Sequence, residues 1–329
     1  MAEGRRARRT VPEIVHVGSA CRDVAPDDPR GWRLGGGVTY ATLTTARLGL
    51  RTAAVIGVDD TARTASELER MRDAGAEIVL VPLAEGPVYH NVETAAGRVQ
   101  TCVRTGVPLP VPSLPAAWLA APAWQLAPVA GEIGDPWAGA LPPSAYVAVA
   151  WQGFLRRLVA GERVARRPPS ASPILARADL VGVSHRDVDP DTPIGALTAL
   201  LKPGARLVVT RGHEGGLVVT VGGSGPEAVL HYAAEPSARE IDPTGAGDTF
   251  LAALVSTVVR PALADGGEKD AYPELRFAAA AGALVVEGPG LSAVPDRWAV
   301  LERMAAARVQ EVVSATTIDR VGADEREAG

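Results

Sequence analysis

Short apolar runs alternate with helical segments along most of the chain. Residues 13–18 and 53–58 are apolar and end at or beside a glycine, as buried parallel strands do at their carboxyl ends. Between them, residues 38–48 are rich in alanine and threonine and stop at Gly49, which predicts a helix with a glycine after its last turn. The chain is therefore expected to begin with a βαβ unit.

The same alternation continues toward the C-terminus. Residues 62–74 predict a second helix, because Ala65, Leu68 and Met71 have helical spacing and Gly75 follows them. Further strands are predicted at residues 124–129, 146–150, 180–183 and 206–210, and a helix is predicted from Pro193 to Gly204. This order predicts an α/β protein with an open, mostly parallel sheet covered by helices on both faces.

Three segments depart from this alternation. Residues 88–104 alternate like strands, have few core apolar residues and carry a turn at Ala96-Gly97, which predicts a hairpin outside the main sheet that acts as a lid. Residues 217–232 predict a second hairpin around a glycine-rich turn. Residues 106–143 are dense in proline and tryptophan and predict no long helix.

The composition of the 329 residues excludes several classes of protein. A net charge of -5 provides no basic face for nucleic acid, and no stretch is long and apolar enough to span a membrane. Cys21 and Cys102 are too few for a disulfide scaffold and are expected to be buried thiols in a reducing compartment. A cytoplasmic protein with no nucleic-acid or membrane partner is therefore expected.

Residues 240–250 are the segment most typical of a chemical site. Small residues precede a predicted apolar helix at 251–259 and leave backbone N–H groups unpaired, so that the helix start forms a cradle for an anion. Asp248 beside this cradle is suited to accept a proton from a hydroxyl that attacks a phosphoryl group. The residues alone leave a second interpretation open, in which Thr244 or Asp248 caps the helix and the glycines only turn the chain.

This segment also resembles a known family signature. Asp-Pro-Thr-Gly-Ala-Gly-Asp-Thr-Phe at residues 242–250 is similar, at every position, to the C-terminal signature of the ribokinase-like, or PfkB, carbohydrate kinases. Residues 35–49 resemble the first glycine-rich signature of that family, and residues 210–216 resemble its nucleotide-side Gly-x-x-Gly turn. The resemblance extends from about residue 13 to about residue 297.

The resemblance implies an architecture. We expect a ribokinase-like three-layer αβα sandwich with a mostly parallel central sheet and a small β lid. The implied bounds are a disordered tail at 1–11, a kinase domain at 12–312 with lid segments at about 20–36 and 86–106, and a disordered tail at 313–329. The resemblance also implies a homodimer through the lid, because the exposed edge of the hairpin would gain from pairing with a partner chain.

The resemblance implies an ATP-dependent kinase of a small sugar, polyol or nucleoside. Asp248 would take the proton of the acceptor hydroxyl, and the backbone N–H groups of Gly245, Ala246 and Gly247 would stabilise the transferring phosphoryl group. The other implied positions are Asp23, Gly36 and Gly37 at the acceptor, Thr210, Gly212 and Gly215 at the nucleotide, and Asp242 and Thr244 at a monovalent cation, potassium. For Asp23, a solvated loop residue is the alternative.

Two segments concern the metal and the substrate. Where the family has Asn-x-x-Glu after a strand, next to the nucleotide and supporting Mg²⁺ through water, this chain has Ser184 and Asp187. Aspartate is a hard oxygen ligand but one methylene shorter than glutamate, so this change puts metal handling in doubt. Residues 152–156, Gln-Gly-Phe-Leu-Arg, resemble a segment of the inositol- and nucleoside-directed branches, with ordinary packing as the alternative.

Two hypotheses of different class follow. The intact loop at Asp248 favours an active kinase, whereas Ser184 and Asp187 favour a ligand-binding or regulatory protein that has lost efficient transfer. A nicotinamide dehydrogenase is not supported, because the glycines at 223–228 lie in a predicted hairpin and not at a helix start. The chain also has no P-loop sequence.

Overall fold

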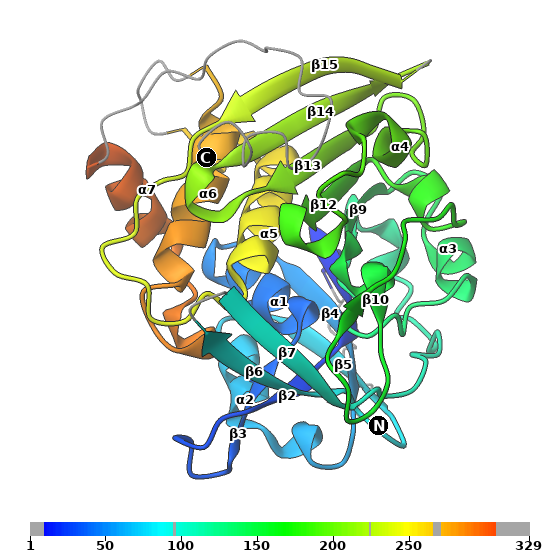
Figure 1. Ribbon diagram of the computed structural model, residues 1–329, viewed down its shortest axis with the longest axis vertical. Helices are drawn as coiled ribbons and strands as arrows, with labels where there is room; N and C mark the ends of the chain where they lie inside the picture. Colours follow the sequence, from blue (N-terminus) through cyan, green and yellow to red (C-terminus); the bar gives the residue numbers. More distant parts are fainter. Residues whose placement is uncertain (1–9, 95–96, 224, 266–270, 307–329) are drawn as a thin grey trace, which may run out of the picture.

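The computed structural model describes residues 10–94, 97–223, 225–265 and 271–306 (Figure 1). The two predicted tails lie outside these residues except for Thr10 and Val11, and so does Ala96 of the predicted turn. Within the described ranges, no helix is both long and apolar enough to cross a bilayer.

The elements occur in the following order along the chain. The strands are β1 (Ile14–Ser19), β2 (Cys21–Val24), β3 (Trp32–Gly35), β4 (Thr52–Val58), β5 (Glu77–Pro82), β6 (Val88–Thr94), β7 (Gly97–Arg104), β8 (Ala123–Leu126), β9 (Tyr146–Ala150), β10 (Arg156–Arg157), β11 (Ala165–Arg166), β12 (Leu180–Ser184), β13 (Arg206–Thr210), β14 (Gly216–Gly222) and β15 (Gly225–Tyr232). The α-helices are α1 (Gly37–Arg47), α2 (Ser66–Asp73), α3 (Pro136–Ala140), α4 (Ile194–Thr198), α5 (Ala246–Val259), α6 (Pro273–Val285) and α7 (Arg297–Ala306). The 3₁₀ helices are η1 (Ala62–Thr64), η2 (Trp118–Ala120), η3 (Trp151–Leu155), η4 (Leu175–Arg177), η5 (His185–Asp187), η6 (Gly212–Glu214), η7 (Pro261–Leu263) and η8 (Gly290–Ala293).

Nine strands form the main sheet, in the order β15-β14-β13-β12-β9-β8-β1-β4-β5 (Figure 1). The pairings from β13 to β5 are all parallel, and the late hairpin of β14 and β15 continues the sheet in antiparallel pairing. From β1 the chain first builds outward through β4 and β5, then returns to the other side of β1 through β8. The prediction of an open, mostly parallel sheet is confirmed, and its switch point lies between β1 and β8.

Side chains of the central strands alternate between two cores. Ala54 and Ile56 of β4 face one core, and Ala53 and Val55 face the other. The long helices α1, α5 and α6 cover the first face, with α5 packed against both α1 and α6. The second face is covered by short elements of the proline- and tryptophan-rich region and of residues 174–201, and it contains four almost fully buried tryptophans, namely Trp118, Trp124, Trp137 and Trp151. Large rings therefore fill a layer in which proline prevents long helices.

A separate four-stranded sheet has the order β3-β2-β6-β7 and lies below α1 and α5 in Figure 1. It joins the hairpin of β6 and β7 to residues 21–35, and its action as a lid stays a prediction. Residues 161–164 occupy the outer edge of β7, because Gly161 N–H donates to Cys102 O and Cys102 N–H donates to Glu162 O, at 2.7 and 2.9 Å. That stretch of edge is therefore not open to a partner chain, and a homodimer through the lid also stays a prediction.

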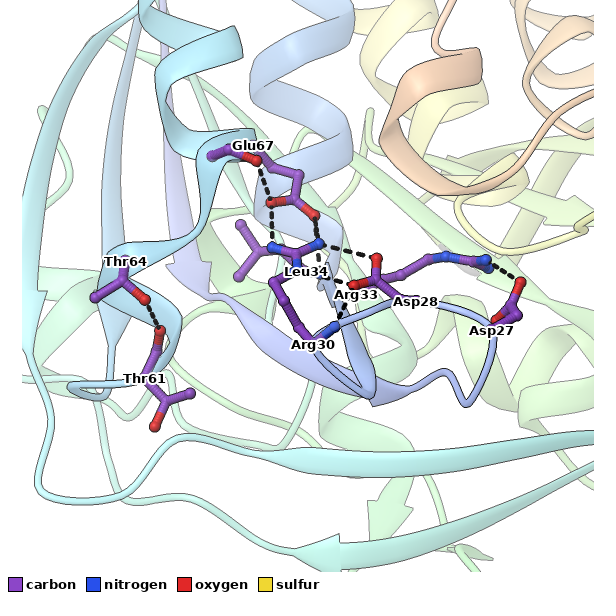
Figure 2. A network of polar contacts seen from close by, with 9 residues as sticks. Asp27, Asp28, Arg30, Arg33, Leu34, Thr61, Thr64 and Glu67 are labelled. Carbon is purple, nitrogen blue, oxygen red and sulfur yellow. Dashed lines mark hydrogen bonds and ion pairs between the residues drawn. The ribbon is translucent and has the colours of Figure 1, made fainter.

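An ion-pair network anchors the turn between β2 and β3 to α2 (Figure 2). The Arg30 guanidinium donates to both carboxylate oxygens of Glu67, at 2.7 and 2.9 Å, and also to Asp28. The Leu34 N–H donates to Glu67 Oε1 at 3.5 Å, and Arg30 lies 4.6 Å from the centre of the Trp32 ring. The pKa of Glu67 is lowered, because these hydrogen bonds to the charged form outweigh the opposing effect of burial.

Three predicted elements are shorter than expected. The helix predicted at 62–74 is divided, because Ala65 adopts an extended backbone and α2 begins only at Ser66. The strand predicted at 124–129 ends at Leu126, two residues before Pro128, which has no N–H for the ladder. The helix predicted from Pro193 to Gly204 ends at Thr198, ahead of turns that lead to Pro203.

We expect Glu67→Gln to lower the free energy of unfolding by about 2 kcal/mol, because the glutamate side chain is only 9% exposed and accepts charge-assisted hydrogen bonds. Glu69→Gln on the same helix is the matched control, since the Glu69 side chain is 67% exposed in its pair with Arg72. Urea denaturation of both variants measures the difference. Equal losses in the two variants would contradict the anchoring role of Glu67.

Candidate active site

The first turns of two helices meet at the switch point of the main sheet. Gly37 begins α1, and a Cβ atom added to it would lie 2.6 Å from Asp248 Oδ1 in the first turn of α5. Gly18 at the end of β1 is equally close to β8, because its Cβ would lie 2.5 Å from Ala127 O. Ligands of open α/β sheets bind outside the carboxyl ends of strands at such a point. Asp248 therefore lies where the topology favours a site.

The loop before α5 is held by backbone geometry and not by a side-chain cap. Gly245 is the N-cap residue, with a φ of 82°, and no side chain caps this helix start. Among the described residues, the N–H groups of Gly245 and Gly247 have no acceptor, while Ala246 N–H donates to Pro243 O at 3.4 Å. The interpretation in which Thr244 or Asp248 caps the helix is therefore wrong. The unpaired N–H groups lie at the N-terminus of α5, which is the positive end of the helix dipole.

Tyr40 of α1 packs directly beneath this loop. Its ring is 2% exposed, and a Cβ on Gly245 would overlap it at well under 3 Å. The loop is also tied to η8, because the Gly290 N–H donates to Asp242 Oδ2 at 3.2 Å. Asp242 Oδ1 accepts the Thr244 N–H at 3.0 Å. These contacts set the position of the loop relative to α1.

The environment of Asp248 suits a proton acceptor. Burial raises the pKa of Asp248 to about 6, against the attraction of the Arg156 guanidinium and with a smaller upward contribution from the Asp187 charge. A carboxylate with this pKa is ionised at pH 7 and is a stronger base than an exposed aspartate. Asp248, Arg156 and Asp187 therefore interact electrostatically within a single site.

The predicted acceptor residues converge on the same place. Asp23 lies within β2, half-buried, and accepts a hydrogen bond from Asn91 Nδ2 at 3.1 Å, so the solvated-loop interpretation is wrong. A Cβ on Gly36, whose φ is 102°, would lie 2.7 Å from Ser19 O. Burial raises the pKa of Asp23 to about 6, with Arg98 and Arg156 opposing this shift and Asp242 adding to it. Asp23 thus lies beside residues 35–37, the last of which contacts Asp248, and its contact with an acceptor stays a prediction.

The predicted nucleotide-side residues lie at the ends of the adjacent strands β12 and β13. Ser184 pairs in register with Thr210, and His185 Nδ1 lies 3.1 Å from Thr210 O. The following turn contains Gly212 and Gly215, whose φ values of 61° and 82° favour glycine. Their arrangement agrees with the predicted Gly-x-x-Gly turn, and their contact with a nucleotide stays a prediction.

The Asp187 carboxylate accepts hydrogen bonds from two neighbouring residues. Its carboxylate accepts the Ser184 N–H at 3.2 Å and the Gln152 amide at 3.3 Å, and the Ser184 hydroxyl accepts the Arg186 N–H at 3.2 Å. This is a capping box at η5. Burial raises the pKa of Asp187, which remains an electrostatic neighbour of Asp248.

Several charged residues of the site were not predicted. Glu132, 4% exposed, accepts backbone N–H groups from Ser19, Val129 and Ala130 and so ties the end of β1 to the segment after β8. The Arg156 guanidinium donates a hydrogen bond to Val129 O at 3.0 Å. Its positive charge opposes the rise in the pKa of Asp248 that burial causes. The family-like segment at 152–156 was a signal for Arg156, whereas no local pattern pointed to Glu132.

The comparisons with known proteins agree with this geometry. The chain shares its fold with a pyrophosphate-dependent kinase in the ribokinase family, complexed with a pyrophosphate analog and myo-inositol, at 19% identity and a TM-score of 0.63, covering 89% of this chain and 100% of that one. Similar matches are *Methanocaldococcus jannaschii* nucleoside kinase, at 15% identity and a TM-score of 0.64 over 91% and 100% of the chains, and *Arabidopsis thaliana* ribokinase complexed with ribose and ATP, at 19% and 0.63 over the same shares.

These matches define the class of the protein: it has the ribokinase fold, and the predicted fold class is confirmed. Residues 177–297 match the model of the pfkB family carbohydrate kinases, so the predicted resemblance to that family is confirmed as well. Among curated proteins, no sequence matches this chain.

Two glycines at the start of α5 should respond to alanine to very different extents. We expect Gly245→Ala to lower the free energy of unfolding by about 3 kcal/mol, because its Cβ would overlap Tyr40 and its φ is left-handed. Gly247→Ala should change stability by less than about 1 kcal/mol, since nothing lies within 4 Å of its Cβ. Thermal or urea unfolding compares the two, and equal effects would contradict the packing of Gly245 on Tyr40.

Proposed function

We propose that this protein transfers the γ-phosphoryl group of ATP to a hydroxyl group of a small sugar, polyol or nucleoside. The observation that carries the proposal is the half-buried carboxylate of Asp248 against Gly37, beside the unpaired N–H groups of Gly245 and Gly247. A base and an anion cradle on one helix turn are the two parts that phosphoryl transfer to a hydroxyl requires.

The residues would act in one step. The acceptor oxygen attacks the γ-phosphorus while its proton passes to the Asp248 carboxylate, and the bond from the γ-phosphorus to the bridging oxygen breaks to release ADP. The N–H groups of Gly245 and Gly247 would donate to the oxygens of the transferring group, and the dipole of α5 would stabilise their charge. Gly37 leaves space for the acceptor hydroxyl because it has no side chain.

The acceptor would bind between the lid and the start of α1. Asp23 is suited to accept two hydrogen bonds from neighbouring hydroxyls, and the chain of Gln100, Asn91 and Asp23, with amide hydrogen bonds of 2.7 and 3.1 Å, orients its carboxylate. Structural relatives were solved with myo-inositol and with ribose and ATP, which supports a polyol acceptor and ATP as donor. One of those relatives is pyrophosphate-dependent, so pyrophosphate belongs among the donors tested.

The residues present fit a magnesium ion. Within the described residues, no group of three side chains is arranged to hold a metal by itself, which suits an ion that keeps several waters and binds substrate phosphates. Asp187 and Asp248 are hard carboxylate ligands whose mutual repulsion a divalent cation would relieve. Asp187 would hold the ion through water, and the ion would neutralise charge on the donor phosphates.

A second candidate function is a ligand-binding or regulatory protein of the same fold. The observation that favours it is the capping box, because Ser184 and Asp187 already satisfy each other's polar groups. An increase in melting temperature with ATP or a polyol, without turnover of any acceptor, would support this candidate over the kinase.

We expect Asp248→Asn to reduce kcat by about 10²- to 10⁴-fold, because an amide accepts no proton from the acceptor hydroxyl. The measurement is release of ADP or phosphate, with ATP or pyrophosphate as donor, across ribose, fructose, inositols, aminosugars and nucleosides. Asp73→Asn is the matched control, since Asp73 is exposed at the end of α2, and it should retain full activity. Turnover that is unchanged in Asp248→Asn would exclude Asp248 as the base.

The activity of the wild type should rise with pH through about 6. The pKa of Asp248 is raised to about 6, so below that value the carboxyl is protonated and kcat/KM should fall about tenfold per pH unit. Asp23, with a similar pKa, should make the acid limb steeper. A pH profile from about 3 to 8 tests this, and an acid limb near pH 4 in place of 6 would show that both carboxylates are exposed during turnover.

A further inference from the structure

One arginine of the four-stranded sheet reaches the loop that begins α5. Arg98 lies on β7, and its Nη2 donates a hydrogen bond to Thr244 Oγ1, 146 residues further along the chain, at 3.0 Å. The same nitrogen lies 3.5 Å from Asp242 Oδ1. The side chains of Arg98 and Asp242 are only 25% and 21% exposed. Their attraction is therefore screened less by solvent than that of a surface pair.

The Asp242 carboxylate has its other partners in the loop itself. Thr244 N–H donates to Oδ1 and Gly290 N–H donates to Oδ2, at 3.0 and 3.2 Å. Among the residues that the structure describes, Arg98 is the one cationic side chain within ion-pair distance of Asp242. The positive charge of Arg98 thus lies beside the carboxylate of Asp242, which accepts the hydrogen bonds that hold this loop.

A monovalent cation does not fit the same place. The resemblance implied that Asp242 and Thr244 hold potassium, and the Arg98 guanidinium contacts both of these side chains. A guanidinium is charged at every pH at which the protein is folded, and a second cation at the same oxygens would be repelled by it. Arginine and potassium are therefore alternatives here.

We propose that Arg98 replaces the monovalent cation at the Asp242–Thr244 loop, so that activity is independent of potassium and docking of the lid itself supplies the charge. This inference rests on the proposed function, because the loop in question would bind the transferring phosphoryl group. Arg98 is a positioning residue, since it contacts Asp242 and Thr244 and not the reacting atoms. Its charge also reaches the acceptor side, where it lowers the pKa of Asp23 while Asp242 raises it.

The first test compares cations. Wild-type kcat/KM should differ by less than about twofold between potassium, sodium and choline chloride at equal ionic strength. Arg98→Ala should lose at least about tenfold in choline chloride, because charge-assisted hydrogen bonds to the loop are gone, and either potassium or millimolar guanidinium should restore most of that loss. Arg98→Lys should retain more activity than Arg98→Ala, because it keeps the charge.

Arg104→Ala is the matched control, since Arg104 lies on the same strand but faces Asp59, 3.8 Å away, and is 44% exposed. Its activity should match the wild type in all three salts. Activation of the wild type by potassium of about tenfold or more would overturn the inference. So would an Arg98→Ala variant that is as active as wild type without potassium, or one whose loss neither cation restores.

A binding measurement separates this inference from the proposed function. Potassium should raise the melting temperature of Arg98→Ala by about 2 °C or more relative to choline, and should not do so for the wild type. If the wild type turned over no acceptor, the proposed kinase activity would fail, while this thermal comparison would still decide whether Arg98 occupies the cation position. Equal potassium shifts in both proteins would overturn the inference.

Discussion

The candidate site depends on the close approach of the first turns of α1 and α5 at the switch point between β1 and β8. That approach requires two positions without side chains: Gly37, where a Cβ would meet Asp248 at 2.6 Å, and Gly245, where it would overlap the Tyr40 ring. Because each helix start presents unpaired N–H groups and partial positive charge, the approach concentrates both in one place. The same packing withdraws Asp248 from solvent and raises its pKa to about 6.

Buried charges around this point are balanced by groups from distant parts of the chain. Glu132 accepts hydrogen bonds from three backbone N–H groups, at the end of β1 and in the segment after β8, which offset the cost of burying its carboxylate. Burial raises the pKa of Asp23, Asp187 and Asp248, and the positive charge of Arg156 opposes this rise at all three carboxyl groups. Arg98 adds a connection from β7 to the loop before α5.

Several contacts tie the lid sheet to the main body. Arg30 and Glu67 fix the turn between β2 and β3 to α2 (Figure 2), and Arg98 contacts the loop before α5. Residues 161–164 cover the edge of β7 and continue from the segment that carries Arg156.

The sequence by itself determined the elements whose signals are local. The strands at 146–150 and 206–210 match the structure at both ends, and the glycine-rich segment at 242–250 lies at the start of α5, because apolar periodicity and glycine stops act over a few residues. Only the tertiary structure decided the partners of that loop. Arg98 contacts this loop, and Glu132 contacts the end of the neighbouring strand β1. Each contact joins residues more than a hundred positions apart, and no local sequence pattern encodes such a contact. Packing likewise overrode periodicity at Ala65, where a buried extended residue divides the predicted helix.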